Sequence, residues 1–186
     1  MTPLVMLDVD GVLNALGDLD CWPDEQNGFA RAEGNLYPIT FSRLVVARLR
    51  NWHESGAAEV QWLTTWGHDA NAGLRELLGM PELVVAGTYD DEGVTAEVDV
   101  TSHAASAPSA PDPLSGRWWK YDVVQRVLRE QPGRTVVWID DELSNDSRFR
   151  RWGETQEHHL TCLGPDPMTG LSPTDLKTLS RLLEDT

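Results

Sequence analysis

The sequence predicts an α/β protein: a three-layer sandwich in which a mainly parallel, five-stranded sheet lies between helices. Two observations lead to this class. Short apolar runs alternate along the chain with stretches of helical period, which is the pattern of βαβ units. Three of those runs end in polar residues, as is expected where a site lies beyond the carboxyl ends of parallel strands.

Five segments are expected to form the sheet. Each contains a short apolar run, such as Leu4-Val5-Met6-Leu7, and such a run is typical of a buried strand. Because ligands bind beyond the carboxyl ends of the strands in such sheets, the last residue of each strand marks the expected site. In chain order the predicted strands are 3–9, 59–64, 83–86, 134–140 and 158–163.

Five segments are expected to be helical. Thr40 or Ser42 can cap the first, in which apolar residues recur on one face as far as Ser55. Ser172 opens a capping box, with Pro173 at the first position of the last helix. The predicted helices are 40–55, 70–78, 118–130, 145–152 and a last one that begins at 173.

The remaining segments are predicted to be loops and small additions to a single domain, 1–186. Residues 10–34 are rich in Gly, Asp and Asn without a sustained period, so we expect a loop with room for a small hairpin. A small flap would span residues 14–38. Residues 101–116 are rich in Ala, Ser and Pro, which predicts a flexible loop. Short extended pieces are expected at 36–39 and 94–100.

The composition is that of a strongly acidic globular protein. Of 186 residues, 40% are hydrophobic and 24% charged, which excludes a disordered chain and a disulfide scaffold. The formal net charge is −15, which disfavours nonspecific binding to nucleic acid. No stretch approaches ~18 apolar residues, and the N-terminus lacks the basic flank of a signal peptide. With only Cys21 and Cys162, we expect a cytoplasmic protein without membrane contact or an obligate protein partner.

Carboxylates gather at two of the expected strand ends. Asp8 and Asp10 follow the first strand, and Asp140 and Asp141 follow the fourth. On neighbouring strands they would lie within a few ångströms, and like charges ~4 Å apart repel by about 4 kcal/mol at an effective dielectric of about 20. The alternative is that they are helix caps and solvated loop residues. A bound cation resolves the repulsion, and oxygen-only ligands favour Mg²⁺, so the sequence predicts a magnesium site.

Four motifs, in order along the chain, resemble those of the haloacid dehalogenase-like (HAD) superfamily. The stretch Asp8-Val9-Asp10-Gly11-Val12-Leu13 after a strand is similar to the first motif. Thr64 at the end of the second strand is similar to the second, and Lys120 just inside a helix to the third. Asp140-Asp141 after Val-Val-Trp-Ile is similar to the fourth.

The resemblance spans about residues 1–165. It implies a Rossmann-like fold, and because the segments between motifs are short, we expect only a minimal cap and an open cleft. The stretch from Glu59 to Asn71 also resembles a HAD subgroup that occurs in bacterial hydrolases and fused to RNA-repair proteins.

The resemblance implies a phosphatase in which an aspartate is the nucleophile. Asp8 would attack phosphorus to form an aspartyl-phosphate, and Asp10 would protonate the leaving oxygen and later activate water. Thr64 and the backbone N–H groups after Asp8 would hold phosphoryl oxygens. Lys120, for which Arg117 is the nearest charged substitute, would offset the charge of nucleophile and phosphate.

The same resemblance assigns the magnesium ligands. Mg²⁺ would be held by Asp8, the carbonyl of Asp10 and either Asp140 or Asp141, with Asp140 the first choice because it stands at the strand end. The ion would neutralise charge in the transition state.

Substrate binding is assigned to residues around the first two motifs. Thr65 is also a rival to Thr64, and helix capping is the alternative for His68 and Asn71. Trp66 could stack on a nucleobase, for which packing is the competing interpretation. The five candidates are Gly11, Thr65, Trp66, His68 and Asn71.

The expected substrate is a phosphorylated small molecule or a nucleic-acid end. An open cleft suits phosphates on large substrates, whereas the charge of −15 opposes a long polynucleotide track. The alternatives are a catalytically silent HAD-like binding or regulatory module, or a nucleic-acid-end phosphatase in RNA or DNA repair. The presence of both Asp8 and Asp10 argues against a silent module, and dehalogenation needs neither the second aspartate nor the metal.

Overall fold

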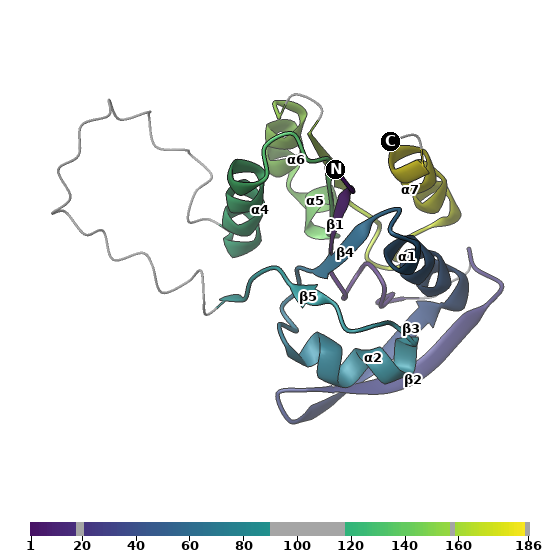
Figure 1. Ribbon diagram of the computed structural model, residues 1–186. Helices are drawn as coiled ribbons and strands as arrows, with labels where there is room; N and C mark the ends of the chain where they lie inside the picture. Colours follow the sequence, from purple (N-terminus) through teal and green to yellow (C-terminus); the bar gives the residue numbers. More distant parts are fainter. Residues whose placement is uncertain (18–20, 90–117, 157–158, 185–186) are drawn as a thin grey trace, which may run out of the picture.

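The computed structural model describes residues 1–17, 21–89, 118–156 and 159–184, and Figure 1 shows them as a layered α/β fold. Five parallel strands form the sheet in the order β5-β4-β1-β6-β7, which confirms the predicted fold class. The strands are β1 (Leu4–Leu7), β4 (Glu59–Trp62), β5 (Val84–Val85), β6 (Val136–Ile139) and β7 (Leu160–Leu163). The expectations for 94–100, 101–116 and Arg117 lie outside the described residues.

Strand β1 occupies the centre of the sheet and sets the geometry of its carboxyl edge. Leu7 pairs with Trp62 of β4 on one side and with Ile139 of β6 on the other. The four residues of β1 are fully buried, as expected for a central parallel strand. In this register the residues that follow β1 and β6, Asp8 and Asp140, emerge side by side.

Helices cover both faces of the sheet. On one face lie α1 (Arg43–Ser55) and α7 (Pro173–Glu184), which pack with Val5 and Leu7 in one hydrophobic cluster. On the other lie α4 (Trp119–Glu130), α5 (Glu142–Asn145) and α6 (Ser147–Glu154), which pack with Leu4 and Met6 in a second cluster. Alternate residues of β1 therefore pack against the helices on opposite faces of the sheet.

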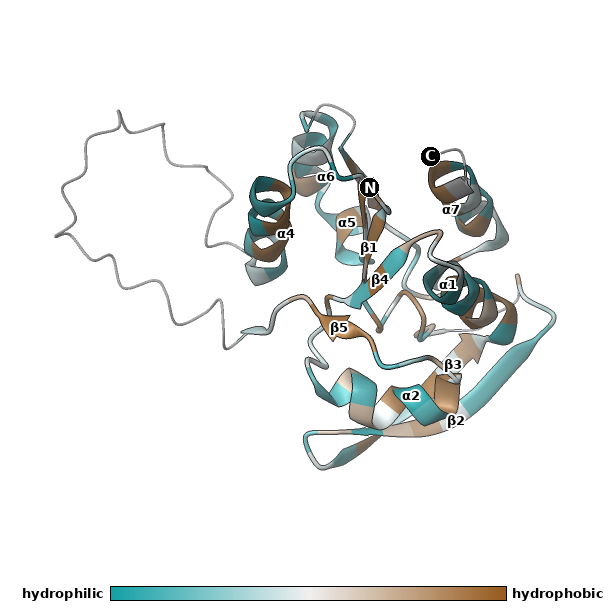
Figure 2. Ribbon diagram, in the orientation of Figure 1, coloured by the Kyte–Doolittle hydropathy of each residue, from teal (hydrophilic) through white to brown (hydrophobic). Residues whose placement is uncertain are grey.

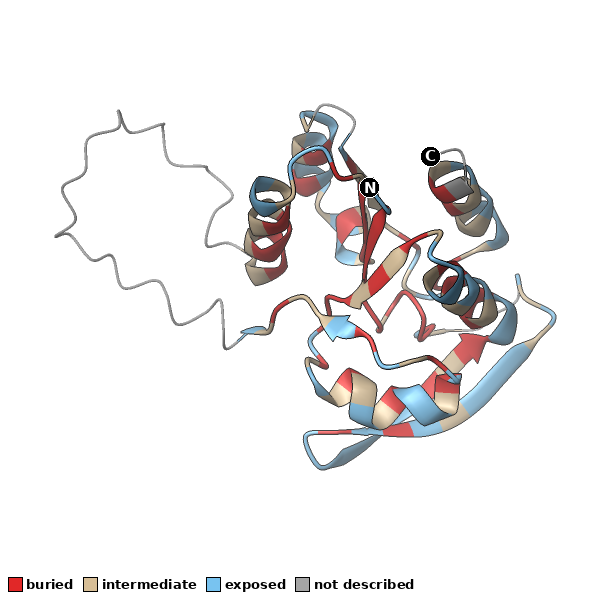
Figure 3. Cartoon of the chain, in the orientation of Figure 1, coloured by how far each residue is buried: buried red, intermediate tan, exposed pale blue. Residues whose placement is uncertain are grey.

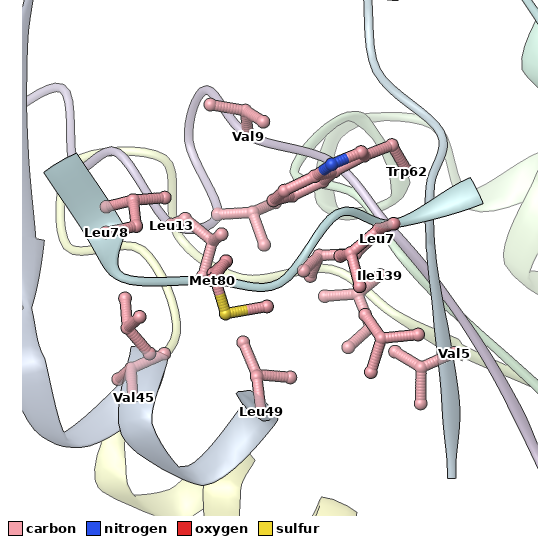
Figure 4. Packing of buried hydrophobic residues seen from close by; sticks show 14 of the residues in the cluster. Val5, Leu7, Val9, Leu13, Val45, Leu49, Trp62, Leu78, Met80 and Ile139 are labelled. Carbon is pink, nitrogen blue, oxygen red and sulfur yellow. The ribbon is translucent and has the colours of Figure 1, made fainter. Parts of the chain in front are cut away.

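The apolar residues are concentrated on the inner surfaces of these layers. Figure 2 shows apolar residues along the inner faces of the helices, and Figure 4 shows Val45 and Leu49 of α1 close to Met80. Ser42 caps α1, its Oγ accepting a hydrogen bond of 3.2 Å from the N–H of Val45. Ser42 rather than Thr40 is therefore the cap of the predicted helix.

A long hairpin takes up the last part of the loop predicted for 10–34, in which room for a small hairpin was expected, and it continues past it to residue 42. Its strands are β2 (Glu25–Ala32) and β3 (Asn35–Ser42), and it occupies much of the range expected for a flap. Glu33 (φ 50°) and Gly34 (φ 78°) join them in a two-residue turn with two positive φ angles, the kind that favours hairpins. Most of β2 is exposed (Figure 3), so it shows no alternation of apolar and polar residues.

Two predicted helices are divided in the structure. The segment 70–78 forms a π-helix, η1 (Ala70–Leu74), followed by α2 (Arg75–Leu78). Gly73 of η1 lies against β2, since a Cβ there would be 2.1 Å from the carbonyl oxygen of Arg31. The segment 145–152 is split between α5 and α6 by Asp146, whose extended backbone ends one helix while its carboxylate accepts a hydrogen bond from the N–H of Arg148 in the next.

None of the helices within the four described ranges is long and apolar enough to cross a bilayer.

Candidate active site

Three carboxylates meet at the carboxyl edge of the sheet. Asp8 follows β1, and Asp140 and Asp141 follow β6. One ligand oxygen from each lies within 4.8 Å of the others. Asp8 and Asp140 are buried and Asp141 is half-buried. We call this group the carboxylate cluster.

A single buried ammonium group bridges two members of the cluster. Lys120, in the first turn of α4, places its Nζ 2.7 Å from Oδ2 of Asp8 and 2.6 Å from Oδ2 of Asp140. The same Nζ lies 5.8 Å and 6.0 Å from the ring centres of Trp118 and Trp119, a cation–π distance. Burial by itself would lower the pKa of Lys120, but the two carboxylates outweigh it and hold that pKa above its ordinary value.

The cluster carries more negative charge than Lys120 balances. Burial, followed by the charge of Asp8, raises the pKa of Asp140 well above its ordinary value, although Lys120 opposes the shift. Burial and the charge of Asp8 raise the pKa of Asp141 in the same direction. The three carboxylates form an all-oxygen ligand set, and their negative charge exceeds the positive charge of the one ammonium group. A divalent cation would balance that excess. The residues present therefore fit Mg²⁺, with Asp8, Asp140 and Asp141 as the side chains that would hold it.

Asp10 lies outside the carboxylate cluster and is held by two neutral donors. Its Oδ1 accepts a hydrogen bond of 2.8 Å from Nδ2 of Asn14, and its Oδ2 accepts one of 2.8 Å from Nε1 of Trp66. No pattern in the sequence indicates that either donor contacts Asp10. Asn14 is the harder of the two to find from the sequence, because an asparagine in a Gly-rich loop is ordinarily a turn residue.

Gly11 allows the first loop to approach the cluster. Its φ is +70°, and a Cβ at this position would lie 2.5 Å from Cγ of Asp141. Glycine is therefore required here by both backbone conformation and space. Because glycine has no side chain, Gly11 can contact a substrate only through its backbone.

Gly11→Ala is expected to lower the free energy of unfolding by about 1–3 kcal/mol, because it adds strain and displaces Asp141. Urea denaturation measures the loss, and Mg²⁺ titration should show weaker binding. Gly34→Ala is the matched control, since Gly34 shares the positive φ (+78°) but a Cβ there would have nothing within 4 Å. Equal losses and equal Mg²⁺ affinities in the two variants would contradict this account of Gly11.

The residues after β4 form a second wall of the site. Thr64 is fully buried, and its Oγ1 lies 3.4 Å from the backbone N of Trp66. Thr65 and His68 are exposed and line a cavity of about 350 Å³, together with Tyr89. The structure thus brings the predicted residues Thr65 and His68 to one opening, with Thr64 at its base.

Trp66 and Asn71 also make contacts within the protein. Trp66 is 8% exposed and packs edge-on against Tyr37 at 5.5 Å, and it lines both the cavity of about 350 Å³ and a smaller one beside Asp10. Asn71 lines neither cavity of this region. Its Oδ1 accepts hydrogen bonds of 3.0 Å from Nε1 of Trp62 and from the N–H of Leu83, so it joins β4 to the segment before β5.

A smaller cavity of about 230 Å³ lies beside Asp10. Its lining includes Tyr37 and Glu33 from the hairpin and Trp66 from the loop after β4. The hairpin residues were not among the predicted site residues, because the fold had to be known before Tyr37 of β3 could be placed beside Trp66 in the loop after β4. Another cavity, about 610 Å³ between the hairpin, α1 and α2, contains none of the predicted site residues.

The comparisons with known proteins agree with this arrangement. The model of the family described as "HAD domain in Swiss Army Knife RNA repair proteins" matches residues 4–176, a range that includes the carboxylate cluster and Lys120. No curated protein and no solved structure matches the chain. With the fold, the order of the motifs and the family match in agreement, the chain belongs to the HAD domains of Swiss Army Knife RNA repair proteins, within the HAD superfamily of hydrolases.

Proposed function

We propose that the protein is a Mg²⁺-dependent phosphatase that hydrolyses phosphomonoesters through an aspartyl-phosphate. The observation that carries the proposal is the buried ammonium of Lys120 between Asp8 and Asp140, with Asp141 in the same cluster. A buried excess of carboxylates is costly to folding, and a bound cation offsets that cost. Asp10, two residues after Asp8, supplies the proton donor that hydrolysis of an ester requires.

The reaction proceeds in two displacements at phosphorus. A carboxylate oxygen of Asp8 forms a bond to phosphorus as the bond to the ester oxygen breaks, and the proton of Asp10 passes to that oxygen to release the alcohol. Water then attacks the phosphorus of the aspartyl-phosphate. Its proton passes to Asp10, the acyl phosphate bond breaks, and inorganic phosphate leaves with Asp8 restored as a carboxylate.

Other side chains hold the transferred group. The Nζ of Lys120 balances the negative charge that gathers between Asp8 and the phosphoryl oxygens, and Thr64 has a hydroxyl at the same edge of the sheet. Mg²⁺, when bound by Asp8, Asp140 and Asp141, supplies positive charge that stabilises the transition state. The cavity of about 230 Å³ beside Asp10 is placed to accept the leaving group.

A phosphorylated RNA end is the second candidate substrate. The description of the family, HAD domains in RNA repair proteins, favours it. The described residues that line the cavities of about 230 Å³ and 350 Å³ include Glu33 and Asp69 but no lysine or arginine. That surface and the net charge of −15 favour a terminal nucleotide or a small phosphomonoester over a long polynucleotide.

A phosphate-release screen tests the proposal. The panel contains aryl phosphates, nucleotides, sugar phosphates, phosphopeptides, and oligoribonucleotides phosphorylated at the 3′ or the 5′ end, each with Mg²⁺ and with a chelator. We expect turnover that requires Mg²⁺, and the oligoribonucleotides decide whether ends are preferred. If Mg²⁺ raises the melting temperature but no ester is hydrolysed, the chain is a binding module and the proposal is wrong.

A further inference from the structure

Both carboxylate oxygens of Asp10 are occupied by hydrogen bonds from neutral N–H groups. Asn14 Nδ2 donates to Oδ1 and Trp66 Nε1 donates to Oδ2, each at 2.8 Å. Asp10 has no ion pair among the described residues. Its orientation is therefore fixed by two side chains rather than by a charge, in contrast to Asp8, which pairs with Lys120.

The two donors are themselves fixed by the hairpin. Asn14 is buried, and its Oδ1 accepts a hydrogen bond of 2.9 Å from the backbone N–H of Thr40 in β3. Trp66 packs edge-on against Tyr37, also of β3, with ring centres 5.5 Å apart. Asp10 is thus connected through one donor on each side to the same strand of the hairpin.

We infer that Trp66 and Asn14 are positioning residues that hold the Asp10 carboxyl group in the orientation for proton transfer. The inference rests on the proposed function, in which Asp10 gives a proton to the leaving oxygen and takes one from water. A carboxyl oxygen has two acceptor sites, so an oxygen that accepts one N–H keeps a second site for the transferred proton. Restricting the rotation of Asp10 removes orientations in which that site faces away from the substrate.

The indole N–H of Trp66 can be removed with little other change. Trp66→Phe keeps an aromatic ring against Tyr37 but deletes the donor to Asp10. Two aryl esters of similar size then separate the role in proton transfer from a general loss of structure. Phenyl phosphate needs its leaving oxygen protonated, whereas p-nitrophenyl phosphate releases a stable anion that needs little help.

The expected result is a loss that depends on the leaving group. In Trp66→Phe, kcat/KM for phenyl phosphate should fall by about tenfold, through kcat rather than KM. For p-nitrophenyl phosphate, kcat/KM should fall by less than about threefold, because that ratio reports steps only as far as release of the alcohol. Asn14→Ala, which removes the other donor, should show the same selectivity.

Trp62→Phe is the matched control. It also deletes one indole N–H of a buried tryptophan, but that group donates to Asn71 Oδ1 at 3.0 Å and not to Asp10. Any loss in this variant should be equal for the two esters. Circular dichroism and thermal unfolding establish that each variant is folded, and if Asn14→Ala is not, Trp66→Phe decides.

The possible failures can be told apart. An equal loss for both esters in Trp66→Phe, or no loss for either, overturns the positioning role while the phosphatase proposal stands. If the unmodified protein hydrolyses neither ester nor any other member of the phosphate panel, the proposed function fails and the role of Trp66 fails with it.

Discussion

Asp8→Asn is expected to abolish phosphate release, with a fall in kcat of at least about 10⁴-fold. An amide is too weak a nucleophile to attack phosphorus, so no step can begin. The change removes one charge from a cluster that is already rich in carboxylates, and Lys120 keeps its 2.6 Å pair with Asp140. The variant should therefore fold, and the loss can be measured as released phosphate at equal concentrations of folded protein.

Three companion measurements make the role of Asp8 specific. Asp8→Glu retains the charge but moves it by one methylene group, and we expect it to be almost as inactive. Asp166→Asn changes an exposed aspartate far along the chain and should keep full activity. Acid quenching of the native protein during turnover should trap a phosphorylated form that hydroxylamine cleaves, as an acyl phosphate does. Retained turnover in Asp8→Asn would remove this residue from the nucleophile role.

Lys120→Met is expected to cost both activity and stability. The substitution leaves Asp8 and Asp140 buried without their shared cation, and removing one partner of a buried ion pair costs about 3–5 kcal/mol. The melting temperature should fall by roughly 10 °C in metal-free buffer. Turnover with Mg²⁺ should fall by at least about 10³-fold, because a charge that stabilises the transition state is lost.

A matched variant and the addition of Mg²⁺ separate the loss of the buried bridge from a general effect of removing a lysine. Lys177→Met removes the other lysine of the sequence, which is exposed on α7, and should leave stability and turnover unchanged. Mg²⁺ should restore part of the stability of Lys120→Met, since the cation takes over the charge balance. An equal melting temperature in the two variants would contradict a buried bridge at Lys120.

Acidification should also restore stability to Lys120→Met, and the sign follows from Asp140. Its pKa is already raised by burial in the folded protein and rises further without Lys120, so the folded state binds a proton that the unfolded state releases. Stability is then lost as the pH rises from the ordinary carboxyl range toward the raised pKa. The melting temperature of the variant should therefore increase as the pH falls from about 7 to about 5.

The sheet could be predicted from the sequence, whereas of the hairpin only the room for it and the extended piece at 36–39 could be predicted, and not its length or pairing. Runs such as Leu4–Leu7 and Val136–Ile139 are buried on both faces, so their continuous apolar sequence indicates a buried strand directly. Strand β2 has the pattern of a surface segment, since most of its residues are exposed. Its pairing depends on a turn at Glu33-Gly34, which is a weaker signal than Asn-Gly.

The site divides in the same way. Asp8 and Asp140 could be located because strand ends converge in a parallel sheet, whichever loops follow. Lys120 lies in the first turn of α4, and its place was predicted from the resemblance to a HAD motif. The contacts of Asp10 could not, because Trp66 approaches it from 56 positions away along the chain. The orientation of the Trp66 indole depends on the hairpin against which it packs, and no local pattern records that contact.

Strand β1 is synthesised before either of the strands that flank it. One partner, Glu59–Trp62, belongs to the first half of the chain, but the other, Val136–Ile139, belongs to the second. Until Ile139 has left the ribosome, one edge of β1 has no native partner, and such an edge is open to aggregation. A fragment that ends before β6 keeps Asp8 and Thr64 but has no completed sheet on which to hold them.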